Sequence, residues 1–137
     1  MKFLLDTNII VDIISKRDGY LDSLEIFKFC ETGHVDGFVS ATTVTDVIYI
    51  LRKYISPDAV RESVRTLLMI VDVADVLKSD ISSAFLSEMK DYEDAVQVSC
   101  AKRIKADYIV THNLKDFDGS AVSVISPSYA VKLLSRF

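Results

Sequence analysis

Four aspartates are the residues of this sequence best suited to chemistry. They are Asp6, Asp46, Asp94 and Asp116. Carboxylates gathered without counter-charges repel one another and raise each other's pKa, and a hard divalent cation removes that conflict. Mg²⁺ typically takes one or two carboxylates and several waters, which leaves positions for a substrate phosphate. Because clustered acids without Cys or His beside them favour Mg²⁺ or Mn²⁺ over Zn²⁺, the four positions indicate phosphoryl chemistry.

Each of these aspartates also has an ordinary structural explanation. Asp6 directly follows an apolar segment, and an acid in that place is equally well explained as a helix cap. Asp46, taken alone, is more simply a solvated group on a helix, and Asp116 an ordinary loop acid. Glu93 and Asp94 could merely complement the dipole of a helix. The prediction of a site therefore depends on all four aspartates reaching the same edge of one sheet.

Short β-branched segments alternate with longer amphipathic ones along the chain. Strands are expected at residues 2–5, 35–39, 70–73, 108–111 and 122–125. Helices are expected at residues 8–15, 20–32, 41–51, 57–68, 80–89, 92–105 and 127–134. Their expected caps are Ser40, Ser56, Ser79, Asp91 and Ser126, and Gly33 is expected to end the second helix.

Strands separated by helices imply a parallel sheet that is covered on both faces. In such a sheet, binding sites form outside the carboxyl ends of the strands, near the point where the strand order reverses. Asp6 and Asp116 follow two of the expected strands, while Asp46 lies about two turns into one helix and Asp94 in the first turn of another. The topology is therefore expected to bring the four carboxylates together.

Composition is typical of one folded domain spanning residues 1–137, because half of the residues are hydrophobic. A net charge of −4 predicts no strong nonspecific attraction to nucleic acid, although a bound cation would change the local field.

Cys30 and Cys100, without a CxxC motif, are expected to be buried free thiols, which suits the cytoplasm. Neither a signal peptide nor a membrane span is expected, since Asp6 and Asp12 interrupt the apolar N-terminal segment.

Taken in order, these segments resemble the PIN-domain family over nearly the whole chain. The resemblance is carried by Asp6-Thr7-Asn8, by Ser-x-x-Thr-x-x-Asp ending at Asp46, by Asp-Tyr-Glu-Asp-Ala ending at Ala95, and by Val-Thr-His-Asn-x-x-Asp-Phe ending at Phe117. It implies a three-layer α/β/α sandwich with a central parallel sheet, and Mg²⁺- or Mn²⁺-dependent cleavage of RNA. In bacterial members it often implies a VapC-like toxin that a cognate antitoxin neutralises.

The resemblance also assigns roles to single residues. The catalytic and metal-binding acids would be Asp6, Asp46, Asp94 and Asp116. Thr7 and Asn8 would shape the turn after the first strand and bind back to the carboxylates. Asn113 stands where many members carry another Asp, so it would be a substitute ligand or would support the ligands, and Glu93 is an alternative acid. The second acid of the family is usually Glu, and Asp46 is one methylene shorter.

Two basic residues, Arg52 and Lys115, lie on segments next to the acids and are expected to contact substrate phosphate. The remaining basic residues near strand ends or on helices, Arg17 and Arg103 among them, are expected on solvated faces. His112 adjoins the expected site, where it could touch phosphate or donate a proton. A plain loop role is preferred for it, because water activated by a metal needs no histidine.

Tyr49 and Tyr54 belong to an apolar stripe, most of which is expected to be core. The remainder would serve a homodimer, as is common in PIN proteins, or a groove for an antitoxin segment.

Three functions remain open from the sequence. The leading hypothesis is a Mg²⁺- or Mn²⁺-dependent endoribonuclease. The alternative is a degenerate PIN domain that binds RNA or a protein without cutting. The short Asp46 and the neutral Asn113 favour this alternative. A phosphotransfer domain with Asp6 as acceptor ranks last, because Asn8 takes the place of the second acid that such a domain would need.

Overall fold

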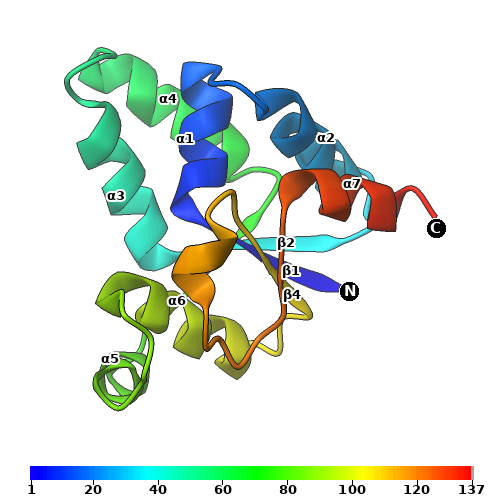
Figure 1. Ribbon diagram of the computed structural model, residues 1–137. Coiled ribbons are helices and arrows are strands. Elements are labelled where there is room, and N and C mark those ends of the chain that lie inside the picture. Colours follow the sequence, from blue (N-terminus) through cyan, green and yellow to red (C-terminus); the bar gives the residue numbers. More distant parts are fainter. Residues whose placement is uncertain (137) are drawn as a thin grey trace.

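A five-stranded parallel sheet forms the centre of the computed structural model, which describes residues 1–136 (Figure 1). The strands are β1 (Lys2–Leu5), β2 (Asp36–Ser40), β3 (Asp72–Ala74), β4 (Tyr108–Val110) and β5 (Val124–Ile125). Their order in the sheet is β3-β2-β1-β4-β5, and each neighbouring pair is parallel. The predicted α/β class and parallel sheet are thus confirmed.

Helices cover both faces of this sheet, as predicted. They are α1 (Thr7–Ser15), α2 (Tyr20–Glu31), α3 (Ala41–Leu51), α4 (Pro57–Leu67), α5 (Lys78–Phe85), α6 (Tyr92–Arg103) and α7 (Pro127–Leu134), with a 3₁₀ turn, η1, at Leu114–Phe117. Figure 1 shows α1, α2, α4 and α7 on one side of the sheet and α6 on the other, with α5 beside α6. The molecule therefore has the three layers of an α/β/α sandwich.

Strand β1 supplies both halves of the core. Phe3 and Leu5 are buried in the larger cluster, together with residues of α1, α2, α3, α4 and α7. Leu4 points to the other face, where it is buried with Val98 and Ala101 of α6. Because successive side chains of a strand alternate between faces, a strand buried on both sides needs an unbroken apolar run, and residues 3–5 provide it.

Most of the predicted helix ends are confirmed by their capping contacts. The side chains of Ser40, Ser56, Asp91 and Ser126 each accept a hydrogen bond from the backbone N–H three residues later. Gly33 follows the end of α2 in the left-handed region, with φ +80°, which Gly adopts at little cost.

The expected helix at 80–89 was placed wrongly at both ends. Leu77, and not Ser79, is the N-cap of α5, because the carboxylate of Asp80 accepts a hydrogen bond from the Leu77 N–H at 2.9 Å. The helix ends at Phe85, four residues before the predicted end. Strands β2 to β5 and helices α1, α2, α4 and α6 differ from their predicted bounds by one or two residues at their ends.

The strand order reverses at β1, since the chain passes from β1 to β2 and β3 on one side and returns to β4 and β5 on the other. The carboxyl ends of β1 and β4 therefore border the crevice where such folds bind ligands. Cys30 and Cys100 are free and buried, as predicted. Among the helices of residues 1–136, none has the length and apolar character needed to cross a membrane.

Candidate functional site

An open pocket of about 710 Å³ lies at this crevice, and all four predicted aspartates line it. Asp6 comes from the end of β1, Asp46 from α3, Asp94 from α6 and Asp116 from η1. The other predicted site residues on its walls are Thr7, Asn8, Glu93 and Asn113. Four elements that are distant in sequence thus deliver their acids to one place.

Asp6 is both a helix cap and a wall of the pocket, so the two explanations of this residue do not compete. Its Oδ1 accepts a hydrogen bond from the Thr7 N–H at 2.8 Å, which caps α1. Its Oδ2 accepts one from Thr111 Oγ1 at 2.8 Å. Burial raises the pKa of Asp6, and the hydrogen bonds from Thr111, Thr7 and Gln97 oppose that shift.

Thr111, at the end of β4, joins Asp6 to the following loop. Besides donating to Asp6, its hydroxyl oxygen accepts hydrogen bonds from Asn8 Nδ2 at 3.1 Å and from the Asn113 N–H at 3.0 Å. Asn8 therefore reaches the carboxylate through Thr111 and not directly, whereas Thr7 binds it through its backbone N–H. The turn around Asp6 is held from two strands, and its orientation is fixed.

Gln97 and Thr43 complete the surroundings of Asp6. Thr43 is the threonine of the Ser-x-x-Thr-x-x-Asp pattern, to which no role was assigned, and Gln97 was not singled out in the sequence. Gln97 is buried on α6, one turn after Asp94, and its Nε2 lies 3.4 Å from Asp6 Oδ1 and 3.2 Å from Thr43 Oγ1. Thr43 Oγ1 in turn lies 3.0 Å from Thr7 Oγ1. The only available signal was the spacing of Gln97 from Asp94, which places both on one helix face.

One face of α3 forms a second wall of the pocket. Thr42, Asp46, Tyr49 and Ile50 recur at helical spacing and all line it. Asp46 remains exposed, although partial burial raises the pKa of its carboxyl. Beside it the Tyr49 ring, 64% exposed, carries the Arg52 guanidinium 3.6 Å from its centre.

The N-terminal turn of α6 forms the most acidic part of the pocket. Asp91 Oδ1 accepts a hydrogen bond from the Asp94 N–H at 3.0 Å, which confirms its capping role. Burial first, and then the negative charges of Asp6, Asp91, Asp116 and Glu93, raise the pKa of Asp94 to about 7. A positive charge placed among these carboxylates would therefore be strongly favoured.

We expect the stability of the cation-free protein to fall as the pH rises from about 5 to about 8. The folded-state pKa of Asp94 lies above that of the unfolded chain, so the folded protein binds more protons in this window and loses stability as Asp94 ionises. Allowing for solvent screening, Asp94 should account for on the order of 1–2 kcal/mol. Urea unfolding in EDTA at both pH values measures the change.

In the Asp94→Asn variant the same measurement should give a flatter pH dependence and a higher stability at about pH 8. The buried acid Asp6 is unchanged in this variant and contributes the remaining slope, since its pKa is also raised. If the stability of Asp94→Asn follows the wild-type pH profile, the pH dependence of stability does not come from Asp94.

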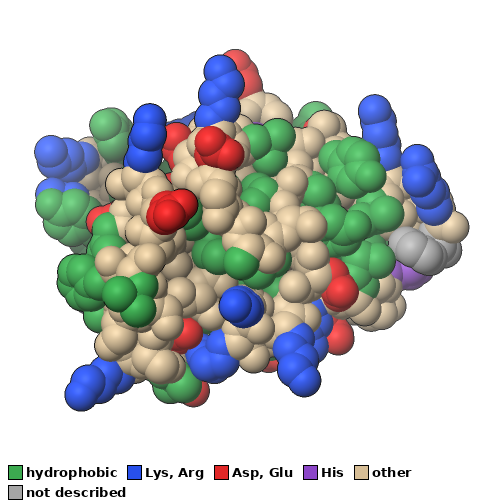
Figure 2. Space-filling view, turned by 60° about the horizontal axis from the view of Figure 1, so that its bottom comes forward, with side chains coloured by type: hydrophobic (Ala, Val, Ile, Leu, Met, Phe, Trp, Pro, Cys, Tyr) green, Lys and Arg blue, Asp and Glu red, His purple; other side chains and the backbone are tan. Residues whose placement is uncertain are grey.

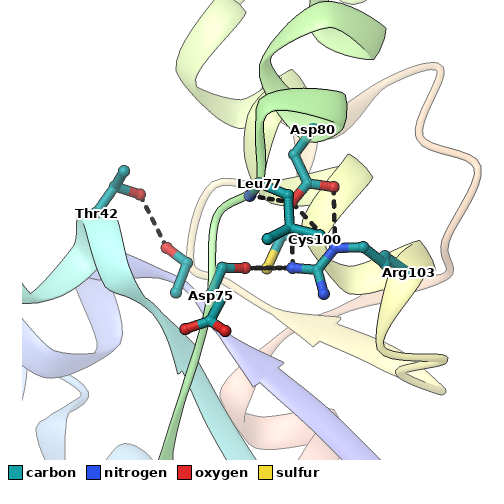
Figure 3. A network of polar contacts seen from close by, with 7 residues as sticks. Thr42, Asp75, Leu77, Asp80, Cys100 and Arg103 are labelled. Atoms are coloured by element: carbon teal, nitrogen blue, oxygen red, sulfur yellow. Dashed lines mark hydrogen bonds and ion pairs between the residues drawn. The ribbon is translucent and has the colours of Figure 1, made fainter.

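An ion pair with one buried partner joins the C-terminal end of α6 to the first turn of α5 (Figure 3). Arg103 Nη2 lies 3.1 Å from Asp80 Oδ2, and the Arg103 guanidinium also donates to the Asp75 carbonyl. The Asp80 side chain is only 4% exposed. Arg103 is exposed, as expected, but it also binds Asp80 of α5, the helix whose Ile81 lines the pocket.

Among the described residues, Arg17 is the one Lys or Arg that lines the pocket. Neither Arg52 nor Lys115, the two residues expected to contact phosphate, is among the lining residues. His112 is outside it as well, and its Nε2 pairs with Asp12 Oδ2 at 2.5 Å. Burial raises the pKa of Asp12, while the charges of His112 and Arg17 oppose the shift.

On the face shown in Figure 2, basic side chains lie partly around the outline and partly on the lower centre, with acidic side chains among them. The net charge of the chain is −4. A cation held in the pocket would therefore strengthen the attraction of a polyanion to it.

The donors of the pocket fit a hard divalent cation. Its lining includes carboxylates, amides and hydroxyls but neither His nor Cys, which is the oxygen-rich set that Mg²⁺ and Mn²⁺ prefer. Within residues 1–136 no three His, Cys, Asp or Glu side chains lie close enough together to hold one ion by themselves. A cation bound here would therefore keep several waters, as Mg²⁺ commonly does.

Comparison with known proteins identifies one family model, described as a PIN domain, that matches residues 2–115. No curated protein matches the chain.

Solved structures with the same fold include toxin–antitoxin proteins. VapBC2 from Rickettsia felis, bound to a DNA fragment from its promoter, has a TM-score of 0.72 at 19% identity, covering 92% of this chain and 98% of that chain. DNA-bound VapBC from Salmonella typhimurium has a TM-score of 0.72 at 20% identity, covering 93% and 98%. VapC20 from Mycobacterium tuberculosis, a toxin that cleaves the sarcin-ricin loop, has a TM-score of 0.64 at 10% identity, covering 78% and 86%. At these identities the likeness is one of fold.

Proposed function

This chain belongs to the PIN-domain family, and we propose that it forms a single nuclease domain that cleaves RNA phosphodiester bonds with the help of Mg²⁺ or Mn²⁺. One observation carries the proposal. Asp6, Asp46, Asp94 and Asp116 arrive from four separate elements and line one pocket at the point where the strand order reverses. A fold does not by itself imply an activity, so the proposal depends on this site.

Asp6 and Asp94 are the proposed principal metal ligands. The Asp6 carboxylate is fixed in direction by its hydrogen bonds. Burial and neighbouring carboxylates raise the pKa of Asp94 to about 7, so a cation would favour its ionised form. Asp116 and Asp46, which are more exposed, would act directly or through waters. A divalent cation in such a site lowers the pKa of a bound water and stabilises the charge that develops on the phosphate. Glu93 and Asn113 line the same space and would orient waters or substrate.

Arg17 is the proposed phosphate contact of the chain itself. We expect Arg17→Ala to weaken binding of a single-stranded RNA about fivefold and to reduce the salt dependence of binding by about one ionic contact. Fluorescence anisotropy in EDTA, where cleavage is prevented, measures both quantities. Lys28→Ala is the matched control, because Lys28 is exposed on α2 and pairs with Glu25 away from the pocket. Equal affinity and salt slope in wild type and Arg17→Ala would contradict the assignment.

Partner proteins are also part of the proposal. The structural likeness to VapBC complexes supports a toxin role with an antitoxin partner. Hydrophobic side chains gather along the left edge of Figure 2, the side on which α3 and α5 lie in Figure 1. Tyr54, Phe85 and Leu86 are 77%, 75% and 87% exposed, and they offer apolar anchors for an antitoxin segment or for a second copy in a homodimer. Buried free thiols suit a protein that acts in the cytoplasm.

A PIN domain that binds RNA or a protein without cutting is the second candidate. The exposed, short Asp46 and the neutral Asn113 favour it. So does the distance between the acids, since no three His, Cys, Asp or Glu side chains within residues 1–136 are close enough to hold one ion. Calorimetric titration with Mn²⁺ discriminates between the two. Site-specific binding that is lost in Asp94→Asn supports the nuclease, whereas no binding at millimolar Mn²⁺ supports the non-cutting domain.

A further inference from the structure

In the carboxamide of Gln97 the nitrogen has hydrogen-bond partners and the oxygen has none among the described residues. Its Nε2 donates to Thr43 Oγ1 at 3.2 Å and to Asp6 Oδ1 at 3.4 Å. Its carbonyl oxygen Oε1 is buried and has no hydrogen-bond donor among the described residues. The residue as a whole is 5% exposed and lines the pocket. A buried acceptor without a donor costs folding free energy, so its presence calls for an explanation.

The orientation of this amide follows from its neighbours. If the group were turned over, the carbonyl oxygen would face the carboxylate of Asp6, and two acceptors would repel each other. The observed orientation therefore keeps an N–H on Asp6 and leaves Oε1 without a donor. Thr43, which receives the other N–H bond, lies 3.0 Å from Thr7 Oγ1 and 3.2 Å from Ser40 Oγ. The carboxamide is thus held between α6, β1 and α3.

Within residues 1–136, one other buried side-chain atom lacks a partner in the same way, the hydroxyl of Ser23 on α2. Ser23 is fully buried and is absent from the pocket lining. Gln97 differs because it touches the best-fixed acid of the proposed metal site.

We propose that Gln97 is a positioning residue for a hydrated divalent cation: its Nε2 fixes Asp6, and its Oε1 accepts a hydrogen bond from a water of the cation's hydration shell. The inference rests on the proposed function. Mg²⁺ keeps several waters in protein sites, and waters on a cation are strong hydrogen-bond donors. Residues that orient metal ligands from behind typically change metal affinity 10–100-fold when replaced.

The test is calorimetric titration of the full chain with Mn²⁺. Gln97→Met keeps the length of the side chain and removes both hydrogen-bonding functions. We expect it to bind Mn²⁺ about tenfold more weakly than wild type. Its melting temperature without metal should stay within about 5 °C of wild type, because the loss of two long hydrogen bonds is offset by the loss of the unsatisfied oxygen. Ser23→Ala, the matched control, should leave Mn²⁺ affinity unchanged.

Gln97→Glu separates the two roles of the amide, since it keeps an oxygen in place of Oε1. Its Mn²⁺ affinity should equal or exceed that of wild type, while its cation-free melting temperature should fall, because a second carboxylate then faces Asp6. Wild-type affinity in Gln97→Met, or Gln97→Glu binding as weakly as Gln97→Met, would overturn the inference alone. Absence of Mn²⁺ binding in the wild type would overturn the proposed metal site together with it.

Discussion

Replacing Asp6 with Asn is expected to lower the rate of RNA cleavage by about 10³-fold or more, with the fold retained. A metal ion contributes several kcal/mol of charge stabilisation to phosphoryl transfer, and about 4 kcal/mol corresponds to a factor of 10³. The variant should fold because Asn keeps an oxygen that can accept the Thr7 N–H, the contact that caps α1. Cleavage of a labelled RNA in Mn²⁺, with circular dichroism on the same sample, measures activity and fold together.

Asp58→Asn is the matched control for this change. Asp58 is an exposed acid in the first turn of α4 and is absent from the pocket lining, so its replacement should leave cleavage unaltered. An Asp6→Asn variant that keeps a tenth or more of the wild-type rate would place the reaction elsewhere in the molecule.

Replacing Arg103 with Met is expected to lower the free energy of unfolding by about 3 kcal/mol, the lower end of the range for a broken buried ion pair. The Asp80 side chain is 4% exposed and would lose the guanidinium, keeping the hydrogen bond from the Leu77 N–H, while the Arg103 side chain is 31% exposed. The carbonyl of Asp75 would lose a donor as well (Figure 3). Urea unfolding at neutral pH measures the loss, and the midpoint should move without a large change in slope.

Two further variants test the reason for this effect. Arg65→Met removes an exposed pair, with side chains of Arg65 and Glu62 77% and 71% exposed, and should change stability by no more than about 0.5 kcal/mol. Asp80→Asn combined with Arg103→Met removes both charges, keeps an oxygen that can accept the Leu77 N–H, and should recover part of the lost stability. Equal losses in Arg65→Met and Arg103→Met would show that burial of Asp80 is not the cause.

The sheet and most helix ends were predictable from the sequence because they depend on local signals. The apolar run at 3–5 indicates a strand buried on both faces, and Ser40, Ser56 and Ser126 cap helices in the way their side chains favour. The start of α5 escaped prediction, since Leu77 supplies the cap position and the distinguishing contact is made by Asp80 three residues later.

The gathering of the four aspartates in one pocket was predictable because the ends of parallel strands and the following helices share one edge of the sheet. The groups that surround them were not, since their roles depend on contacts between distant segments. Gln97 reaches Asp6 across 91 positions of sequence, and Arg103 reaches Asp80 across 23. The contact of the Arg52 guanidinium with the ring of Tyr49, a pocket-lining residue, was likewise not predicted.

The central claim is that this pocket cleaves RNA with a divalent cation, and one measurement tests it most directly. A labelled single-stranded RNA is incubated with the purified chain in EDTA, Mn²⁺ is then added in excess, and the RNA is followed over time on the same sample. The account predicts intact RNA before the addition, cleavage after it, and no cleavage after it in the Asp94→Asn variant. Intact RNA after Mn²⁺ is added to the wild type, or equal cleavage in EDTA, would contradict it.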